Sequence, residues 1–202
     1  MANDAREEKE RLRKRYLLWR DSLLKDEVNK KSKKIISKIL TLDEYKSAKR
    51  VLLYYPFRNE VNVLLLLKEK GGKSFYFPVV DFENKRLVVK KLEGKISDGD
   101  FLVNKFGIPE PKSKCILKDK SLIDVVVVPA VVFDREGYRI GFGGGYYDKF
   151  LKTVSGCKIG VCYSEQLLKK LPHQRFDVKV DFVITEEEVV EVRGKREKVV
   201  KS

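Results

Sequence analysis

The residue types best suited to chemistry gather in one stretch, Gly137-Tyr138-Arg139-Ile140-Gly141-Phe142-Gly143-Gly144-Gly145-Tyr146-Tyr147-Asp148. Four of the five residues 141–145 are glycine, so their backbone N–H groups can converge on an anion without interference from Cβ atoms. A helix that begins at Tyr146 would add the positive end of its dipole. Arg139 can donate charge-assisted hydrogen bonds to phosphate. The stretch therefore predicts a loop that binds a polyphosphate.

Neither common phosphate-binding signature is present in this glycine-rich stretch. A P-loop requires Gly-Lys-Ser/Thr, whereas Gly145 is followed by Tyr146. The dinucleotide pattern GxGxxG, counted from Gly141, also fails at Tyr146. A flexible turn or a close helix crossing is the structural alternative. Asp148 could pair with the helix dipole or hold Mg²⁺ together with phosphate oxygens.

The rare residues exclude other kinds of site. His173 is the single histidine, so a zinc site with two histidines is impossible and a catalytic triad would have to use this residue. The cysteines Cys115, Cys157 and Cys162 show no CxxC spacing. This pattern disfavours a zinc ribbon and a disulfide framework.

The first part of the chain predicts two helices. Four large apolar residues spaced by four, three and four positions form one stripe: Leu12, Tyr16, Trp19 and Leu23. A break is expected near Lys25, with Asp26 as a cap of the next helix. Lysines surround the apolar stripe of that second helix, which runs from Val28 to Leu40.

From residue 50 onwards, short β-rich segments alternate with helical ones. We expect strands at 50–55, 74–78, 87–92, 123–128, 158–162 and 182–184, and helices at 63–70 and 146–154. This alternation predicts an α/β fold with three layers, a mostly parallel central sheet with helices on both faces, preceded by an N-terminal helix pair. Ligands of such folds bind at the carboxyl ends of the strands, here the loops after Tyr55, Val128 and Cys162.

Composition sets the class of protein. The 202 residues are 43% hydrophobic and suit one domain, 1–202, with a helical segment 1–45 and a basic tail 193–202. The net charge is +14: residues 1–50 hold 16 basic and 9 acidic residues, and residues 193–202 hold 5 and 1. This charge would suit nucleic acid or solvated helix faces. No apolar run predicts a membrane span or a signal peptide, so we expect a cytoplasmic protein.

The sequence resembles the 5-formyltetrahydrofolate cyclo-ligase family, also called 5,10-methenyltetrahydrofolate synthetases. The glycine-rich stretch carries most of the resemblance. Weaker matches follow the family's order along the chain: residues 9–13, Glu60-Val61, 107–111, Val128-Pro129, Phe133-Asp134, Gln166, Leu171-Pro172 and Val180-Asp181. Two positions depart from the pattern, because Phe142 stands where many members have arginine and Ala130 where glycine is usual.

The resemblance implies an ATP- and Mg²⁺-dependent ligase that converts 5-formyltetrahydrofolate to 5,10-methenyltetrahydrofolate, releasing ADP and phosphate. The formyl oxygen would attack the γ-phosphorus, and the neighbouring folate nitrogen would then close the ring. Such a transfer needs positioning and charge neutralisation more than a protein nucleophile, in keeping with the single histidine. The resemblance implies small-molecule substrates, no nucleic-acid or membrane partner, and a monomer.

The resemblance also assigns roles to individual residues. Catalysis would involve Arg139 and Tyr146, and Mg²⁺ would be held by Asp148 and Asp181. ATP would contact Lys9, Arg13, Arg139, Ile140, Gly141, Phe142, Gly143, Gly144, Gly145, Tyr146 and Tyr147. The folate would contact Tyr55, Glu60, Phe142, Gly143, Gly144, Gly145 and Tyr146, with the Glu60 carboxylate accepting two hydrogen bonds from the pterin.

Two other functions remain open at the level of sequence. One is a nucleic-acid-binding protein that uses the basic helices and the basic tail. The other is a nucleotide-binding protein that shares the glycine-rich loop but acts on a different second substrate.

Overall fold

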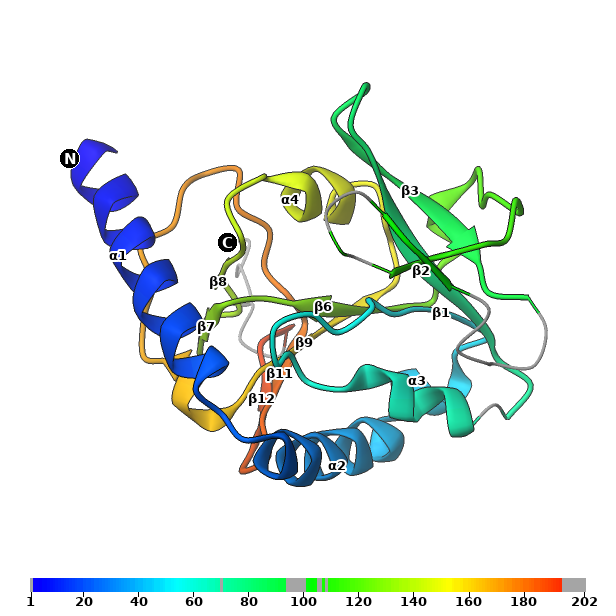
Figure 1. Ribbon diagram of the computed structural model, residues 1–202, viewed down its shortest axis with the longest axis horizontal. Coiled ribbons are helices and arrows are strands. Elements are labelled where there is room, and N and C mark those ends of the chain that lie inside the picture. Colours follow the sequence, from blue (N-terminus) through cyan, green and yellow to red (C-terminus); the bar gives the residue numbers. More distant parts are fainter. Residues whose placement is uncertain (1, 70, 94–100, 105–106, 108, 194–202) are drawn as a thin grey trace, which may run out of the picture.

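The computed structural model describes residues 2–69, 71–93, 101–104, 107 and 109–193 (Figure 1). Its centre is a seven-stranded sheet in the order β12-β11-β9-β6-β1-β2-β3. The strands are β1 (Arg50–Leu52), β2 (Ser74–Asp81), β3 (Arg86–Lys91), β6 (Val125–Pro129), β9 (Cys157–Val161), β11 (Phe182–Ile184) and β12 (Val189–Glu191). The inner strands pair in parallel, and only the edge strands β3 and β12 are antiparallel to their neighbours.

Helices lie on both faces of this sheet, as the sequence predicted. They are α1 (Ala2–Asp21), α2 (Lys25–Thr41), α3 (Asp43–Ser47), α4 (Tyr146–Leu151) and the 3₁₀ turns η1 (Val63–Lys68), η3 (Lys120–Leu122) and η4 (Ser164–Gln166). In Figure 1, α2 and α3 lie below the sheet and α4 above it, while α1 runs along one side. The expected break between the first two helices is confirmed, but Asp26 is not the cap. Leu24 occupies that position, and Asp26 lies within the first turn of α2.

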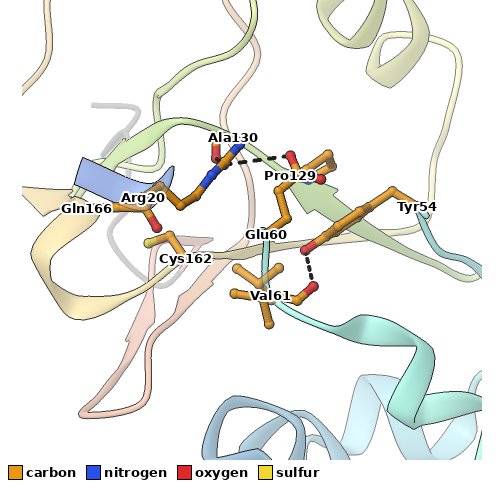
Figure 2. A pocket seen from close by; sticks show the side chains of 9 residues that line it. Arg20, Tyr54, Glu60, Val61, Pro129, Ala130, Cys162 and Gln166 are labelled. Atoms are coloured by element: carbon orange, nitrogen blue, oxygen red, sulfur yellow. Dashed lines mark hydrogen bonds and ion pairs between the residues drawn. The ribbon is translucent and has the colours of Figure 1, made fainter. Parts of the chain in front are cut away.

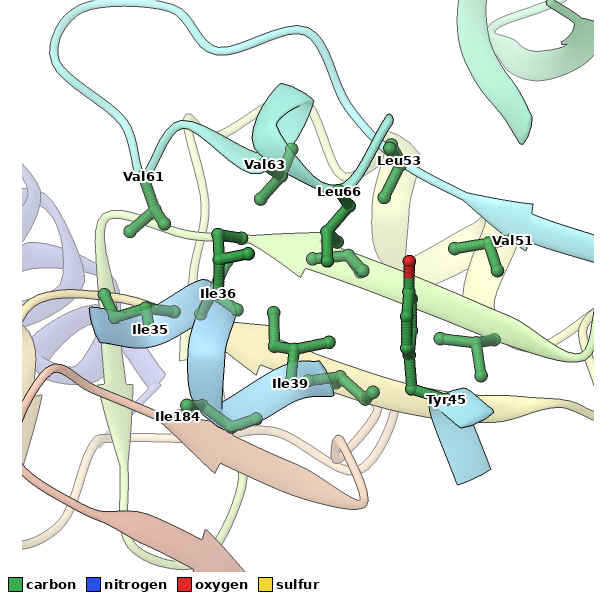
Figure 3. Packing of buried hydrophobic residues seen from close by; sticks show 14 of the residues in the cluster. Ile35, Ile36, Ile39, Tyr45, Val51, Leu53, Val61, Val63, Leu66 and Ile184 are labelled. Carbon is green, nitrogen blue, oxygen red and sulfur yellow. The ribbon is translucent and has the colours of Figure 1, made fainter. Parts of the chain in front are cut away.

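The β-branched run at the centre of the sheet explains how the layers are held together. Residues 125–128 are fully buried, as expected for a central strand covered on both faces. Val125 and Val127 pack into the cluster that contains Ile39 of α2 (Figure 3). Val126 and Val128 pack into the opposite cluster with Phe150 of α4. Successive side chains of a strand point to opposite faces, so one strand supports both layers.

Two smaller sheets complete the fold. β7 (Val132–Asp134), β8 (Arg139–Ile140) and β10 (Leu167–Leu168) form a sheet in the order β10-β7-β8, and β4 (Phe101–Val103) pairs with β5 (Pro109–Pro111). Of the basic tail 193–202, only Arg193 belongs to the described residues. Across the described part of the chain, no helix combines the length and apolar character needed to cross a membrane.

The order of the strands determines which loops meet. β9, β6 and β1 are neighbours and run in parallel. The segments that follow their carboxyl ends, which contain Cys162, Ala130 and Glu60, therefore lie along one edge of the sheet. The β7–β8 hairpin returns from that edge and leads into the glycine-rich loop and α4.

Candidate functional site

A small pocket lies at the carboxyl edge of the sheet (Figure 2). It is narrow and partly open to solvent, and its lining comes from α1, from the ends of β6 and β9, and from the segments that follow β1, β6 and β9. The lining residues are Arg20, Tyr54, Glu60, Val61, Pro129, Ala130, Val161, Cys162 and Gln166. The pocket is therefore formed where the fold predicts a ligand site.

Glu60 and Arg20 are the charged residues of this pocket, and both are buried, with 6% and 1% of their surface exposed. The Glu60 Oε1 and Arg20 Nη1 atoms are 3.7 Å apart. Phe57 N–H donates to Glu60 Oε2 at 3.0 Å. Arg20 donates through Nε to the carbonyl oxygen of Arg58 at 2.8 Å and through Nη1 to that of Ala130 at 3.2 Å. The two charges are thus fixed in place by backbone groups.

Three buried polar atoms around this pocket have no hydrogen-bond partner among the described residues: Glu60 Oε1, Arg20 Nη2 and the hydroxyl of Tyr147. Burial raises the pKa of Glu60 to about 7, although Arg20 and the Phe57 N–H act in the opposite direction. Burial and the Glu60 charge also raise the pKa of Tyr147. Buried polar groups without hydrogen bonds are costly, so these three atoms mark the pocket as the candidate site for a polar ligand.

The turn before Glu60 has a constrained conformation. Arg58 and Asn59 both have positive φ values, 50° and 56°, which few residues other than glycine adopt. The Asn59 amide donates to the carbonyl oxygens of Arg20 and Leu23 at 3.1 and 3.0 Å. The Tyr163 hydroxyl donates to the Asn59 carbonyl oxygen at 3.0 Å. These contacts join the turn to the end of α1 and set the position of the Glu60 carboxylate.

The glycine-rich loop lies directly before α4. Gly145 is the N-cap of this helix with a φ of 67°, and Gly143 has a φ of 103°, both in a region that favours glycine. A Cβ atom on Gly144 would lie 2.7 Å from the ring of Tyr146. Arg13 donates through Nε to the Gly141 carbonyl oxygen at 2.8 Å. The glycines are thus required for the conformation of the loop and for its close contact with neighbouring side chains.

The other basic residues predicted to bind phosphate are Lys9 and Arg139, and each has a carboxylate partner. Lys9 donates to Asp177 at 2.6 Å. Arg139 is 8% exposed and donates to Asp148 at 2.8 Å and to the Val178 carbonyl oxygen at 3.1 Å. Both cations are thus held in place by carboxylates within the chain.

The loop and the pocket adjoin each other. The ring of Phe142 lies 5.4 Å from the guanidinium group of Arg20, and Tyr147 is close enough to Glu60 for its pKa to respond to the carboxylate. On α1, Lys9, Arg13 and Arg20 are four and seven residues apart, which places them on one face of the helix. One helix therefore provides basic groups to both halves of the site.

The two acidic residues predicted to hold Mg²⁺ have separate partners. Asp148, on α4, pairs with Arg139. Asp181 directly precedes β11, where its Oδ2 accepts a hydrogen bond from Lys158 N of β9 at 2.8 Å. Strands β9 and β11 begin there, so Asp181 lies at the amino edge of the sheet. Among the described residues, no three or more His, Cys, Asp or Glu side chains form a metal-binding cluster.

Two further predicted residues occupy positions that the sequence did not indicate. The Tyr55 ring packs edge-on against Phe101, with 5.0 Å between ring centroids, and the neighbouring Tyr54 lines the pocket instead. Consecutive side chains of an extended segment point in opposite directions. Ile140 is buried in a cluster with Leu12, so only its backbone is available to a nucleotide.

Arg20 is the main residue that the sequence analysis missed. It lies four positions after Tyr16 and seven after Arg13, on the inward face of α1. The sequence feature that could have indicated Arg20 is the position of a charged residue next to the apolar stripe of the first helix. Gln166 is also buried; its amide donates to the Val131 carbonyl oxygen at 2.7 Å and its oxygen accepts from Tyr163 N at 3.1 Å.

Comparisons with known proteins identify relatives along nearly the whole chain. The model of the 5-formyltetrahydrofolate cyclo-ligase family matches residues 5–186. A 5-formyltetrahydrofolate cyclo-ligase from Mycoplasma pneumoniae is 31% identical over 185 residues, covering 89% of this chain and 99% of the relative. The one from Haemophilus influenzae is 33% identical over 147 residues, covering 69% and 76%. The solved structure of Aquifex aeolicus 5,10-methenyltetrahydrofolate synthetase superposes with a TM-score of 0.80 at 38% identity, covering 92% and 93%.

Proposed function

Because the chain belongs to the 5-formyltetrahydrofolate cyclo-ligase family, we propose that it converts 5-formyltetrahydrofolate and ATP to 5,10-methenyltetrahydrofolate, ADP and phosphate. The protein is a ligase that forms a carbon–nitrogen bond. One observation carries the proposal for this chain: a buried pocket with unpaired hydrogen-bonding groups adjoins a glycine-rich loop surrounded by basic residues. Such a site suits a polar ring in one half and a polyphosphate in the other.

The proposed reaction has two steps. The formyl oxygen attacks the γ-phosphorus of ATP, and the bond from that phosphorus to the bridging oxygen breaks, so that ADP leaves. The neighbouring folate nitrogen then attacks the formyl carbon and loses its proton, and the carbon–oxygen bond breaks to release phosphate. Neither step needs a nucleophile from the protein. The chain contributes by holding the two substrates in line and by neutralising charge.

The folate ring would occupy the pocket around Glu60. A carboxylate accepts hydrogen bonds from the amino and ring N–H groups of a pterin, and Glu60 Oε1 accepts no hydrogen bond within the described structure. Phe142, 49% exposed, and Tyr146 lie on the side of the glycine-rich loop and would cover the ring. Tyr55 would act at the margin of the site, since Tyr54 takes the position in the pocket.

The phosphates of ATP would occupy the glycine-rich loop. Backbone N–H groups of residues 141–145 and the first turn of α4 would face them, with Lys9 and Arg13 of α1 on the other side. Lys9 would exchange Asp177 for a phosphate oxygen. Arg139 and Tyr146, which lie at the two ends of the loop, are the residues we assign to the reacting γ-phosphoryl group.

Asp148 is the carboxylate whose surroundings best fit Mg²⁺. It lies in the first turn of α4 beside the glycine-rich loop, and its side chain is 34% exposed. Mg²⁺ typically takes one or two carboxylates together with phosphate oxygens and water, and would there neutralise phosphate charge. The assignment of Asp181 stays a prediction, because its Oδ2 is engaged by the backbone of β9.

An absorbance assay tests the proposed function. Purified protein is mixed with 5-formyltetrahydrofolate, ATP and Mg²⁺, and the near-ultraviolet absorbance of the methenyl product is followed, with ATP left out as a control. We expect the absorbance to rise only in the complete mixture. No rise under conditions in which an authentic cyclo-ligase is active would refute the proposal, and a response to other acceptors but not to formyl-folate would indicate a different second substrate.

A further inference from the structure

Arg20 is the charged residue of the pocket to which the resemblance gives no role. Its side chain is 1% exposed, and its Nη2 atom has no hydrogen-bond partner among the described residues. The facing Glu60 Oε1 atom is also buried and has no hydrogen-bond partner among the described residues. Figure 2 shows the two side chains facing each other as an ion pair in the pocket, which leaves one donor and one acceptor there without a hydrogen bond.

The remaining contacts of the two side chains fix the direction of these unused groups. Arg20 Nε and Nη1 donate to two backbone carbonyl oxygens, those of Arg58 and Ala130. A guanidinium group is planar and rigid, so these two bonds also orient Nη2. Glu60 Oε2 accepts from Phe57 N. The separation of 3.7 Å between Glu60 Oε1 and Arg20 Nη1 exceeds a normal hydrogen bond, so the two side chains leave part of their capacity for a third partner.

We propose that Arg20 contacts the substrate and determines which ring the pocket accepts. Nη2 would donate to a ring carbonyl oxygen while Glu60 Oε1 accepts from the N–H groups next to it. This inference rests on the proposed function, in which the ligand is a 2-amino-4-oxo pteridine. The edge of that ring carries a carbonyl oxygen, a ring N–H and an amino group in sequence, and it matches one donor beside one acceptor.

The proposal predicts discrimination at a single position of the ring. In an analogue with an amino group in place of the 4-oxo group, an N–H donor of the ring would face the N–H donor of Arg20. Neither group would then have an acceptor. A site that is built to hydrogen-bond a substrate group strongly rejects an analogue that lacks the group. Wild-type protein should therefore bind 5-formyltetrahydrofolate at least about tenfold more tightly than its 4-amino-4-deoxy counterpart.

The test is the ratio of the two dissociation constants, measured by titration calorimetry for wild type, Arg20→Met and Arg20→Lys. Arg20→Met removes the donor, and Arg20→Lys keeps the charge without the planar fork. The matched control is Arg11→Met, which removes an exposed arginine from the same helix. We expect the ratio to fall toward one in Arg20→Met, to fall in part in Arg20→Lys, and to stay at the wild-type value in Arg11→Met.

A purely structural role for Arg20 would weaken both ligands by the same factor and leave the ratio unchanged, which would overturn the proposal. If Arg20→Met does not fold, wild-type protein alone decides, because equal affinity for the 4-oxo and 4-amino rings also overturns it. Failure to bind 5-formyltetrahydrofolate at all would refute the proposed function and this inference together. Binding of formyl-folate without discrimination would refute only the inference.

Discussion

The Glu60 carboxyl group predicts how substrate affinity depends on pH. Burial raises its pKa to about 7, and the ionised form is the one that accepts N–H groups from a pterin. The ionised fraction rises about tenfold between pH 6 and pH 8 for such a group, so folate affinity should rise by about the same factor. Glu60→Gln should weaken binding by about tenfold or more and remove this dependence. Fluorescence of Trp19, the single tryptophan, provides the measurement.

Stability of the ligand-free protein provides the control for this titration. A carboxyl group whose pKa is raised by folding favours the folded state below its unfolded value of 4.5, and this contribution is lost as the pH rises through about 7. Relative to wild type, Glu60→Gln should therefore become more stable as the pH increases over that range. If the free energies of unfolding of the two proteins changed in parallel with pH, the pKa of Glu60 would not be raised by folding.

The different surroundings of Asp148 and Asp181 predict different effects when each is replaced by asparagine. Asp148→Asn should raise the Mg²⁺ concentration required for half-maximal activity severalfold, because an amide is a weaker ligand for a hard cation. Asp181→Asn should chiefly lower the free energy of unfolding by about 1 kcal/mol, since it weakens the bond to Lys158 N. Activity against Mg²⁺ concentration and denaturant titration measure the two effects. A shifted Mg²⁺ curve for Asp181→Asn with unchanged stability would support a metal-binding role instead.

Individual residues show what the sequence could reveal about the site. Glu60 and the cations around the glycine-rich loop were predicted, because a motif and a family pattern marked them. Arg20 was not predicted, because sequence alone does not show that position 20 of α1 faces the carbonyl oxygens of Arg58 and Ala130 instead of water. Tyr55 was predicted to line the pocket, but Tyr54 does so, for a similar reason. The direction of each side chain depends on where the strand begins to turn.

Among the elements, the glycine-rich loop depends on backbone conformations that other residues adopt poorly. Gly143→Ala would place a Cβ atom on a residue with a φ of 103°, near the Arg13 guanidinium. We expect the KM for ATP to rise about tenfold or more, with less effect on folate affinity, because the loop would move away from its phosphate-binding shape. Steady-state kinetics with each substrate varied in turn measure the two effects.

The control for Gly143→Ala is Gly72→Ala. Gly72 also has a positive φ, 77°, and nothing lies within 4 Å of a Cβ atom built there. Both variants should lose about 1 kcal/mol of stability, but Gly72→Ala should keep the wild-type KM for ATP. Equal KM values in all three proteins would show that the conformation of Gly143 has no part in nucleotide binding.

The long and strongly patterned elements were predicted best. The two N-terminal helices, the β2–β3 hairpin and the central strand β6 lie close to their predicted positions. Short elements were missed: β8 and β10 contain two residues each, and their pairing is set by tertiary contacts. The strand predicted at 50–55 ends at Leu52, where the chain leaves the sheet for the site. The helix predicted at 146–154 ends at Leu151.

For the molecule as a whole, the net charge of +14 is the feature that would suit a nucleic-acid partner. Several basic residues of the N-terminal segment have carboxylate partners within the chain, as Arg11 with Glu8 and Lys31 with Glu186. We therefore expect only weak, non-specific binding of a labelled oligonucleotide, with a dissociation constant of about 10⁻⁵ M or weaker near physiological salt. Nanomolar binding that survives such salt in a titration would contradict this expectation.

The predicted α/β fold class, a mostly parallel sheet with helices on both faces, is confirmed, because the order of strands and helices in the sequence was sufficient to indicate it. The organisation as one domain stays a prediction. The monomeric state also stays a prediction. Light scattering of the purified protein at micromolar concentration would measure its mass, and we expect the mass of one chain, 23.5 kDa.

Helix α1 sets the spacing between the two halves of the site. Arg13 lies at the glycine-rich loop and Arg20 in the pocket, and seven residues of α-helix advance about 10 Å along the axis. A straight helix keeps this spacing constant. The spacing therefore sets the linker length of an inhibitor that binds both halves of the site. A compound that joins a pteridine to an anionic group about 10 Å away would engage both halves at once, whereas one with a shorter linker would reach only one half.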